Sequence, residues 1–182
     1  MLAAREQFWD AGYAGTSLED LMRVTGLGKG SLYAAFGDKH QLFLRAVREY
    51  ADTSVARLRE RLAATPRALD ALTAFVLAPV GNPDGVRRGC LMANSTCELA
   101  TVDDQLRDEA QRMYDLVTDE VAVGVRRATA EGDLPGGTDP DTFARTLLTA
   151  QQGLTYMGRT GLDVTALGAA AETLVSHLLP RR

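Results

Sequence analysis

The chain has 182 residues, 46% of them hydrophobic and 24% charged, which is typical of one or two folded domains and excludes a disordered chain. No apolar run approaches the ~18 residues of a membrane span. The first residues lack a secretory pattern, and two cysteines cannot form a disulfide framework. A cytoplasmic protein is expected. A net charge of −4 excludes a surface that is basic throughout, so binding to nucleic acid would depend on local positive charge.

Apolar residues recur three and four positions apart along almost the whole chain, which predicts an all-α protein of about nine helices. Thr16 and Glu19 form a capping-box pattern, Asp38 and Asp163 are expected N-caps, and Thr65-Pro66 has the cap-then-proline pattern of a helix start. The expected helices cover about residues 2–11, 16–25, 29–35, 38–62, 88–99, 103–130 and 163–178, with further helices after 65 and 139 and loops at 80–85 and 131–137.

Two of these helices are short and are joined by a tight turn at Leu27-Gly28, which is the arrangement of a helix-turn-helix. In that motif the start of the second helix faces base edges in the major groove of DNA. Lys29 offers a cation there, Ser31 a small donor and acceptor, and Tyr33 a phenolic donor. Free amides at the helix start would also attract phosphate.

The first 45 residues contain a set of short segments at characteristic spacing: Phe8-Trp9, Gly12-Tyr13, Gly15-Thr16-Ser17, Leu21, Gly26 to Tyr33, Phe36 to Lys39 and Leu42-Phe43. These segments closely resemble the DNA-binding domain of the TetR family of bacterial regulators. The resemblance implies a three-helix DNA-binding domain over residues 1–45. It also implies a helical effector-binding and dimerisation domain over 46–182, with a homodimer formed through the last two long helices.

The same resemblance implies contacts with DNA. The implied phosphate and groove contacts are Thr16, Ser17, Lys29, Gly30, Ser31, Tyr33 and Lys39, with His40 beside them. Gly28 departs from the family, which often has a small hydroxyl residue there, so one phosphate contact is in doubt. The alternative is purely structural: the hydroxyls and glycines build caps and turns, Tyr33 belongs partly to the core, and the lysines are solvated.

The helical body can hold an effector pocket lined by apolar residues and a few polar ones. Cys90, Asn94 and Cys97 are spaced to share one face of the helix expected at 88–99. The candidate ligand-binding residues are Cys90, Asn94, Met113, Tyr114, Val117, Gln151 and Tyr156. The alternative is that these residues belong to the core or to an interface between subunits.

The segment Gly89-Cys90-Leu91 resembles a subset of TetR-like regulators, some of which sense oxidants or electrophiles through a cysteine. Neighbouring arginines and a helix N-terminus would lower the pKa of such a thiol, although a buried and inert cysteine is the alternative. The two histidines, His40 and His177, have no metal-ligand spacing, and no catalytic constellation is present. We therefore expect no metal, no cofactor and no enzymatic activity.

The last two expected helices carry broad apolar stripes with small residues, which favours a two-fold seam with a second copy. The small residues are Gly153, Gly158, Gly168, Ala169 and Ala170. The resulting hypothesis is a repressor that leaves a palindromic operator when a small-molecule effector binds. The alternatives are an activator, a sensor that has lost specific DNA binding, and a small helical enzyme.

Overall fold

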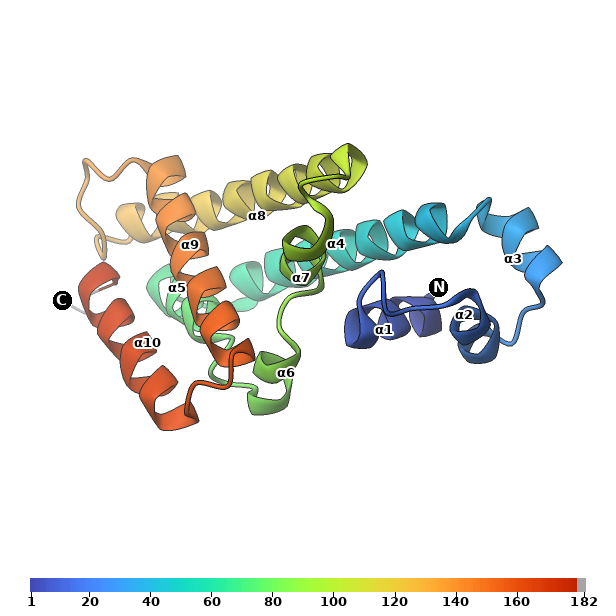
Figure 1. Ribbon diagram of the computed structural model, residues 1–182. Helices are drawn as coiled ribbons and strands as arrows, with labels where there is room; N and C mark the ends of the chain where they lie inside the picture. The colour runs from blue at the N-terminus through green and yellow to red at the C-terminus, as the bar shows by residue number, and fades with distance from the viewer. Residues whose placement is uncertain (180–182) are drawn as a thin grey trace. The chain divides into compact units, whose positions relative to one another are not determined.

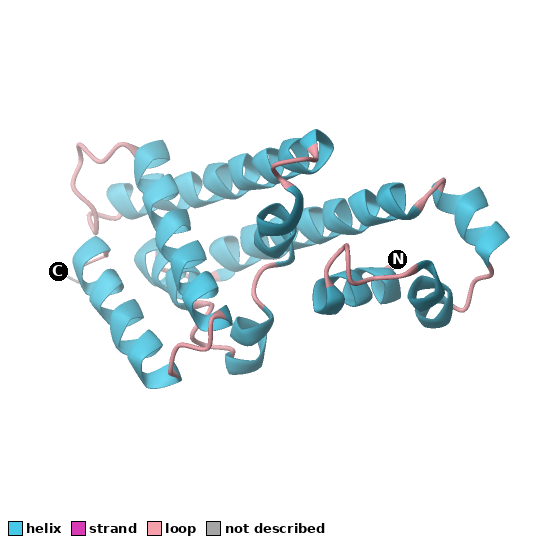
Figure 2. Cartoon of the chain, in the orientation of Figure 1, coloured by secondary structure: helices cyan, strands magenta, loops and turns pink. Residues whose placement is uncertain are grey.

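A computed structural model describes residues 1–179, and this part of the chain contains ten helices and no strand (Figures 1 and 2). The all-α prediction is confirmed. One helix beyond the expected nine or so, α6, begins in the segment 80–85 that was predicted as a loop. The helices are α1 (Leu2–Ala11), α2 (Leu18–Thr25), α3 (Lys29–Phe36), α4 (Lys39–Ala64), α5 (Ala68–Leu77), α6 (Pro83–Arg88), α7 (Leu91–Leu99), α8 (Asp104–Ala130), α9 (Pro140–Arg159) and α10 (Val164–Leu178).

The chain forms two compact units. The first contains residues 1–53 and 91–113, and the second contains residues 54–90 and the chain from 114 onward. The division falls inside α4 and α8, so each of these long helices belongs to both units. The predicted domain boundary after residue 45 stays a prediction. None of the described helices is both long and apolar enough to cross a membrane.

The core of the first unit forms where α1, α2, α3 and the start of α4 meet. Phe8 and Leu21 are buried there, as are Leu32 and Phe43, and the rings of Phe8 and Phe43 meet edge to face at 5.2 Å. Helix α1 packs on α2, and α2 packs on α3. Since each helix turns its apolar residues inward, the polar start of α3 is left facing solvent.

The capping box of α2 lies one residue later than the sequence pattern predicted. Ser17 is the N-cap: its hydroxyl accepts a hydrogen bond from the Asp20 N–H at 3.0 Å, and Asp20 accepts one from the Ser17 N–H at 3.0 Å. The prediction of Thr16 with Glu19 was therefore wrong. Thr16 is buried, and its hydroxyl donates to the Gly12 carbonyl at 2.7 Å, so it cannot serve as the cap.

The start of α5 was also predicted too early. Residues 65–67 are not helical, and the guanidinium of Arg127 in α8 donates to two of their carbonyls, those of Thr65 and Pro66, at 2.6 Å each. Glu131 accepts a hydrogen bond from the Ala68 N–H at 2.9 Å and so caps α5 from a distant segment. The helix start depends here on tertiary contacts that no local pattern contains.

Two further differences surround the expected loop at 80–85. Pro83 begins the short helix α6, whose N-cap Asn82 accepts a hydrogen bond from the Gly85 N–H. The next helix begins at Leu91 rather than at Arg88, because Gly89 adopts a φ of +75°. Cys90 therefore lies outside α7, and the helical spacing that placed it on one face with Asn94 and Cys97 does not apply to it. The predicted caps Asp38 and Asp163 are confirmed.

The second unit is built around α9. This helix packs against α5, α6 and α10, and α10 also packs against α5 (Figure 1). Gly158 of α9 is buried against Val86 and Leu167, and a Cβ at this position would overlap the Val86 side chain. Packing within one chain thus explains why position 158 is a glycine. Gly153 and Gly168 have no neighbour within 4 Å of a Cβ position.

Candidate nucleic-acid interface

Helices α2 and α3 are each eight residues long and are joined by a turn that begins at Gly26. Gly26 adopts the left-handed conformation, with φ +71°, which ends α2 and redirects the chain. The N-cap of α3 is Gly28, which has no side chain to cap the first N–H groups of the helix. These N–H groups therefore remain available to an anion such as a DNA phosphate.

The start of α3 presents its polar residues to solvent. Lys29, Gly30 and Ser31 are exposed, whereas Leu32 is buried in the core. Tyr33 is 44% exposed and lies with its ring 5.8 Å from the Lys29 ammonium. This placement is the one that DNA contact requires, and the contact itself stays a prediction.

Ser17 and Thr16 differ in how they could serve as phosphate contacts. Ser17 is exposed at the start of α2, where a phosphate would also meet the positive end of the helix dipole. Thr16 is fully buried and donates its hydroxyl to Gly12. Its side chain therefore supports the turn before α2. Ser17 is the more exposed of the two, and its hydroxyl donates to Asp20 Oδ2 at 2.7 Å, a bond that a phosphate would have to replace.

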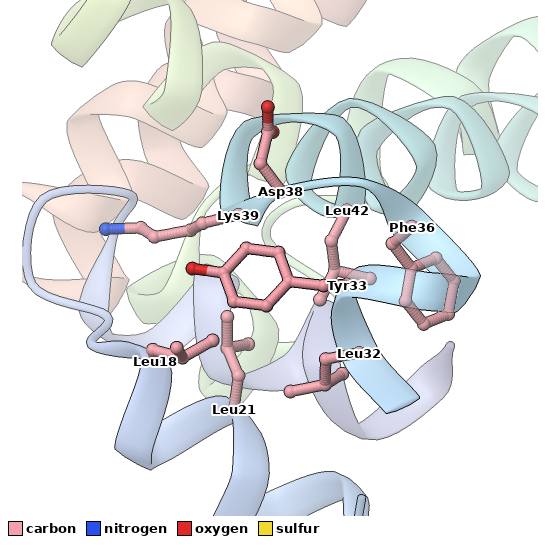
Figure 3. A pocket seen from close by; sticks show the side chains of 8 residues that line it. All are labelled: Leu18, Leu21, Leu32, Tyr33, Phe36, Asp38, Lys39 and Leu42. Atoms are coloured by element: carbon pink, nitrogen blue, oxygen red, sulfur yellow. The ribbon is translucent and has the colours of Figure 1, made fainter. Parts of the chain in front are cut away.

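Lys39 and His40 lie at the start of α4 and have partners within the first unit. The Lys39 ammonium lies 4.3 Å from the centre of the Tyr13 ring, within cation–π range. His40 Nε2 lies 2.7 Å from Asp103 Oδ2, so this ring nitrogen is engaged within the chain. Burial raises the pKa of the Tyr13 phenol, and the carboxylates of Asp38, Asp103 and Glu98 add to the shift. Lys39 and the Tyr33 hydroxyl extend to the same side of the helices (Figure 3).

Two hollows lie among the helices of the first unit. The one in Figure 3 measures about 10 Å³, the size of a single water, and is a packing gap between α2, α3 and α4. The other measures about 190 Å³ and is lined by Thr25 and by apolar residues, among them Met1, Val24 and Leu27. Neither is lined by a predicted ligand-binding residue.

The predicted ligand-binding residues differ widely in exposure. Cys90, Met113 and Val117 are buried in the chain, Asn94, Tyr114 and Gln151 are half-buried, and Tyr156 is 59% exposed. Asn94 and Met113 belong to the first unit, and the other five belong to the second. Cys97 is exposed, whereas Cys90 is 8% exposed. The effector site stays a prediction. Among the described residues, no group of His, Cys, Asp or Glu could hold a metal ion.

Sequence reasoning missed two carboxylates that contact the helix-turn-helix segment. Glu98 of α7 binds the turn between α1 and α2, and Asp103 binds His40. Both contacts join residues more than 60 positions apart. No local pattern signals such a pair, because an acidic residue near a helix end is ordinary in any sequence.

Family models match both parts of the chain. Residues 1–46 match the model described as bacterial regulatory proteins of the tetR family, and residues 64–174 match the tetracyclin repressor-like C-terminal domain. The two matched ranges cover most of the chain, so the likeness extends well beyond the helix-turn-helix segment.

Similar proteins agree with these models. An uncharacterised HTH-type transcriptional regulator of Bacillus subtilis, YezE, is 32% identical over 96% of this chain and 92% of its own length. The HTH-type transcriptional repressor ComR of Escherichia coli is 25% identical over 93% of this chain and 82% of its own length. Among solved structures, a cysteine mutant of the regulator CifR, complexed with 26-base-pair operator DNA, is 27% identical with a TM-score of 0.80. That match covers 94% of this chain and 91% of the CifR chain.

Proposed function

Because this chain belongs to the TetR family of DNA-binding transcriptional regulators, we propose that it is a repressor that binds a palindromic operator and leaves it when a small-molecule effector binds. The members of this family are regulators rather than enzymes. Three points go beyond membership of the family: repression rather than activation, a palindromic operator, and release by a small-molecule effector.

The observation that carries the proposal is the exposed start of α3. Lys29, Ser31 and Tyr33 project from a helix whose first N–H groups have no side-chain cap. Side chains at this position of a helix-turn-helix reach base edges, and free helix N–H groups bind phosphate. The structure of CifR with its operator supports the same use of the fold.

The palindromic operator follows from symmetry. TetR-family regulators act as dimers, and a two-fold dimer presents two identical recognition helices. Half-sites about one DNA turn apart would then be read by one α3 from each subunit. An effector would release the DNA by binding more tightly to a state in which the two helices no longer match that spacing. Helix α4, which belongs to both units, is the covalent route for this change.

The experiment is binding of the purified full-length protein to its own upstream intergenic DNA and to a scrambled duplex, over a series of salt concentrations. We expect preferential binding to the upstream DNA, with an affinity that falls steeply with salt because bound phosphates release counterions. Equal binding to both duplexes at every salt concentration would contradict the proposal. That result would favour the alternative function, a sensor protein that has lost specific DNA binding.

A further inference from the structure

The turn between α1 and α2 is folded around the carboxylate of Glu98, which comes from α7. Glu98 Oε2 accepts a hydrogen bond from the Tyr13 N–H at 3.0 Å, and Oε1 accepts one from the Ala14 N–H at 2.7 Å. A Cβ on Gly12 would lie 2.8 Å from Oε2, and Gly12 has a φ of +75°. The backbone of the turn thus fits a carboxylate supplied by a helix 85 positions away.

This turn leads directly into the first turn of α2. The Thr16 hydroxyl donates to the Gly12 carbonyl at 2.7 Å, and the Thr16 N–H donates to the Tyr13 carbonyl at 3.3 Å. Ser17, the next residue, is the N-cap of α2 and an expected phosphate contact. A change in the position of the turn would therefore move the residue that is expected to bind DNA.

Tyr13 connects the same turn to the start of α4. Its ring lies 5.0 Å from the Phe43 ring and 6.1 Å from the His40 ring, and the Lys39 ammonium lies 4.3 Å from its centre. Asp103, close after α7 in the chain, contacts the same His40 through its Oδ2, 2.7 Å from His40 Nε2. The starts of α2 and α4, both expected to contact phosphates, thus depend on α7 and the residues that follow it.

We propose, on the basis of the proposed function, that Glu98 is a positioning residue for operator binding. It touches no DNA in this proposal. It holds the Tyr13 and Ala14 amides so that Ser17 and Lys39 are placed together for the phosphate backbone. The division of the chain agrees, since α7 forms one compact unit with the helix-turn-helix segment.

The direction in which DNA affinity changes distinguishes this positioning role from a simple effect of charge. Glu98 carries a negative charge on the unit that binds DNA. Removing a negative charge tightens DNA binding when charge alone matters, because the phosphate backbone repels carboxylates. Loss of a positioning contact weakens binding instead. A matched control is Asp108→Asn, which removes the same charge from an exposed position on α8 within the same unit.

The experiment compares the full-length wild-type protein with Glu98→Gln, Glu98→Ala and Asp108→Asn, using the upstream DNA at one fixed salt concentration. We expect Glu98→Ala to bind roughly tenfold more weakly, because it loses two hydrogen bonds to a charged acceptor. Glu98→Gln keeps an acceptor oxygen and should lie between this variant and wild type. Asp108→Asn should bind as tightly as wild type or slightly more tightly. Hydrogen exchange of the Tyr13 and Ala14 amides should accelerate in Glu98→Ala.

Unchanged or tighter DNA binding by both Glu98 variants, beside a wild-type protein that binds normally, would overturn the role of Glu98. Unchanged amide exchange in Glu98→Ala would overturn it as well. Absence of specific binding by the wild-type protein would overturn the proposed function itself, so the two failures are distinguishable. If Glu98→Ala lowers stability, Glu98→Gln still provides the comparison, with circular dichroism as the check on folding.

Discussion

At the scale of single residues, the start of α3 separates residues that hold the fold from residues that are free to bind. Leu32 is buried, while Lys29 and Ser31, which precede it in the same helix, are exposed. A substitution at Leu32 would therefore change stability and DNA binding together. A substitution at Lys29 changes the surface alone, which makes it the informative residue for the DNA contact.

Lys29→Ala should weaken operator binding by roughly three- to tenfold and reduce the slope of log affinity against log salt by about 1, the amount expected for one lost phosphate contact. The melting temperature should not change, because Lys29 is exposed. Binding measured at four salt concentrations gives the slope. Arg57→Ala, which removes an exposed cation from α4 in the second unit, is the control and should leave the slope unchanged. A Lys29→Ala slope equal to that of wild type would argue for a solvated lysine.

The capping box of α2 should survive in acid. The Ser17 hydroxyl and then the Arg23 guanidinium, with the Ser17 N–H, lower the pKa of Asp20 from 3.8 to about 2. A lowered pKa in the folded state contributes stability above pH 3.8 that is lost as the pH falls through 2. An NMR titration of the Asp20 carboxyl carbon should give a midpoint near 2, and Ser17→Ala should move it upward. A wild-type midpoint near 3.8 would mean that the box is not formed.

At the scale of helices, local sequence signals predicted most boundaries. Helix α1 and the starts of α9 and α10 follow from apolar spacing with Gly12, Asp139 and Asp163 at their ends. The starts of α2 and α7 were displaced by local features, the Ser17 cap and the positive φ of Gly89, whereas the start of α5 was displaced by distant residues. The Thr65-Pro66 pattern was overridden because Arg127 and Glu131 bind the backbone between α4 and α5. Such contacts arise only after the helices have packed, so helical spacing and cap preferences cannot reveal them.

Arg127→Ala should therefore destabilise the protein more than its surface position suggests. The guanidinium donates to the carbonyls of Leu62, Thr65 and Pro66 and so satisfies the end of α4. We expect a loss of about 2 kcal/mol in the free energy of unfolding, since several charge-assisted hydrogen bonds disappear. Denaturant unfolding measures the change.

The neighbouring Arg126→Ala provides the control for that measurement. Arg126 is more exposed and has an ion pair with Asp141 at 3.8 Å, so its loss should cost less than about 0.5 kcal/mol. Equal losses for both variants would show that the carbonyl contacts of Arg127 do not contribute to stability.

At the scale of the whole molecule, the DNA-binding segment could be predicted from the sequence, whereas the distant residues that contact it could not. Two short helices joined by the tight turn at Leu27-Gly28 predicted the helix-turn-helix, and the resemblance of the first 45 residues implied its family. The contacts of Glu98 and Asp103 lie in the same unit but come from residues 91–113. The sequence determines the effector-binding residues less well than the DNA-binding segment. Met113 is buried and Tyr156 is exposed, although both fit the same helical spacing.

Several apolar side chains of α9 and α10 in the second unit are exposed in the single chain. Tyr156 and Met157 of α9 are 59% and 44% exposed, and Val164 of α10 is 45% exposed. Gly153 of α9 and Ala169 and Ala170 of α10 are small and exposed, and a Cβ at Gly153 would have no neighbour within 4 Å. Isolated apolar residues on a surface are ordinary, but this combination on two consecutive helices is typical of a seam between helix pairs.

Ala170→Glu should convert the dimer into a monomer. Ala170 is exposed in the single chain, so the substitution leaves the fold intact, while a carboxylate placed in an apolar seam would be desolvated without a partner. We expect the dimer dissociation constant to rise at least about tenfold, a cost of ~1.4 kcal/mol, measured by analytical ultracentrifugation. Binding to a palindromic operator should weaken in parallel, because the two recognition helices would no longer be joined. Ala56→Glu, the same change at an exposed position of α4, should remain dimeric. A dimeric Ala170→Glu protein would place the subunit interface elsewhere, and the symmetry argument for the operator would then need a different pair of helices.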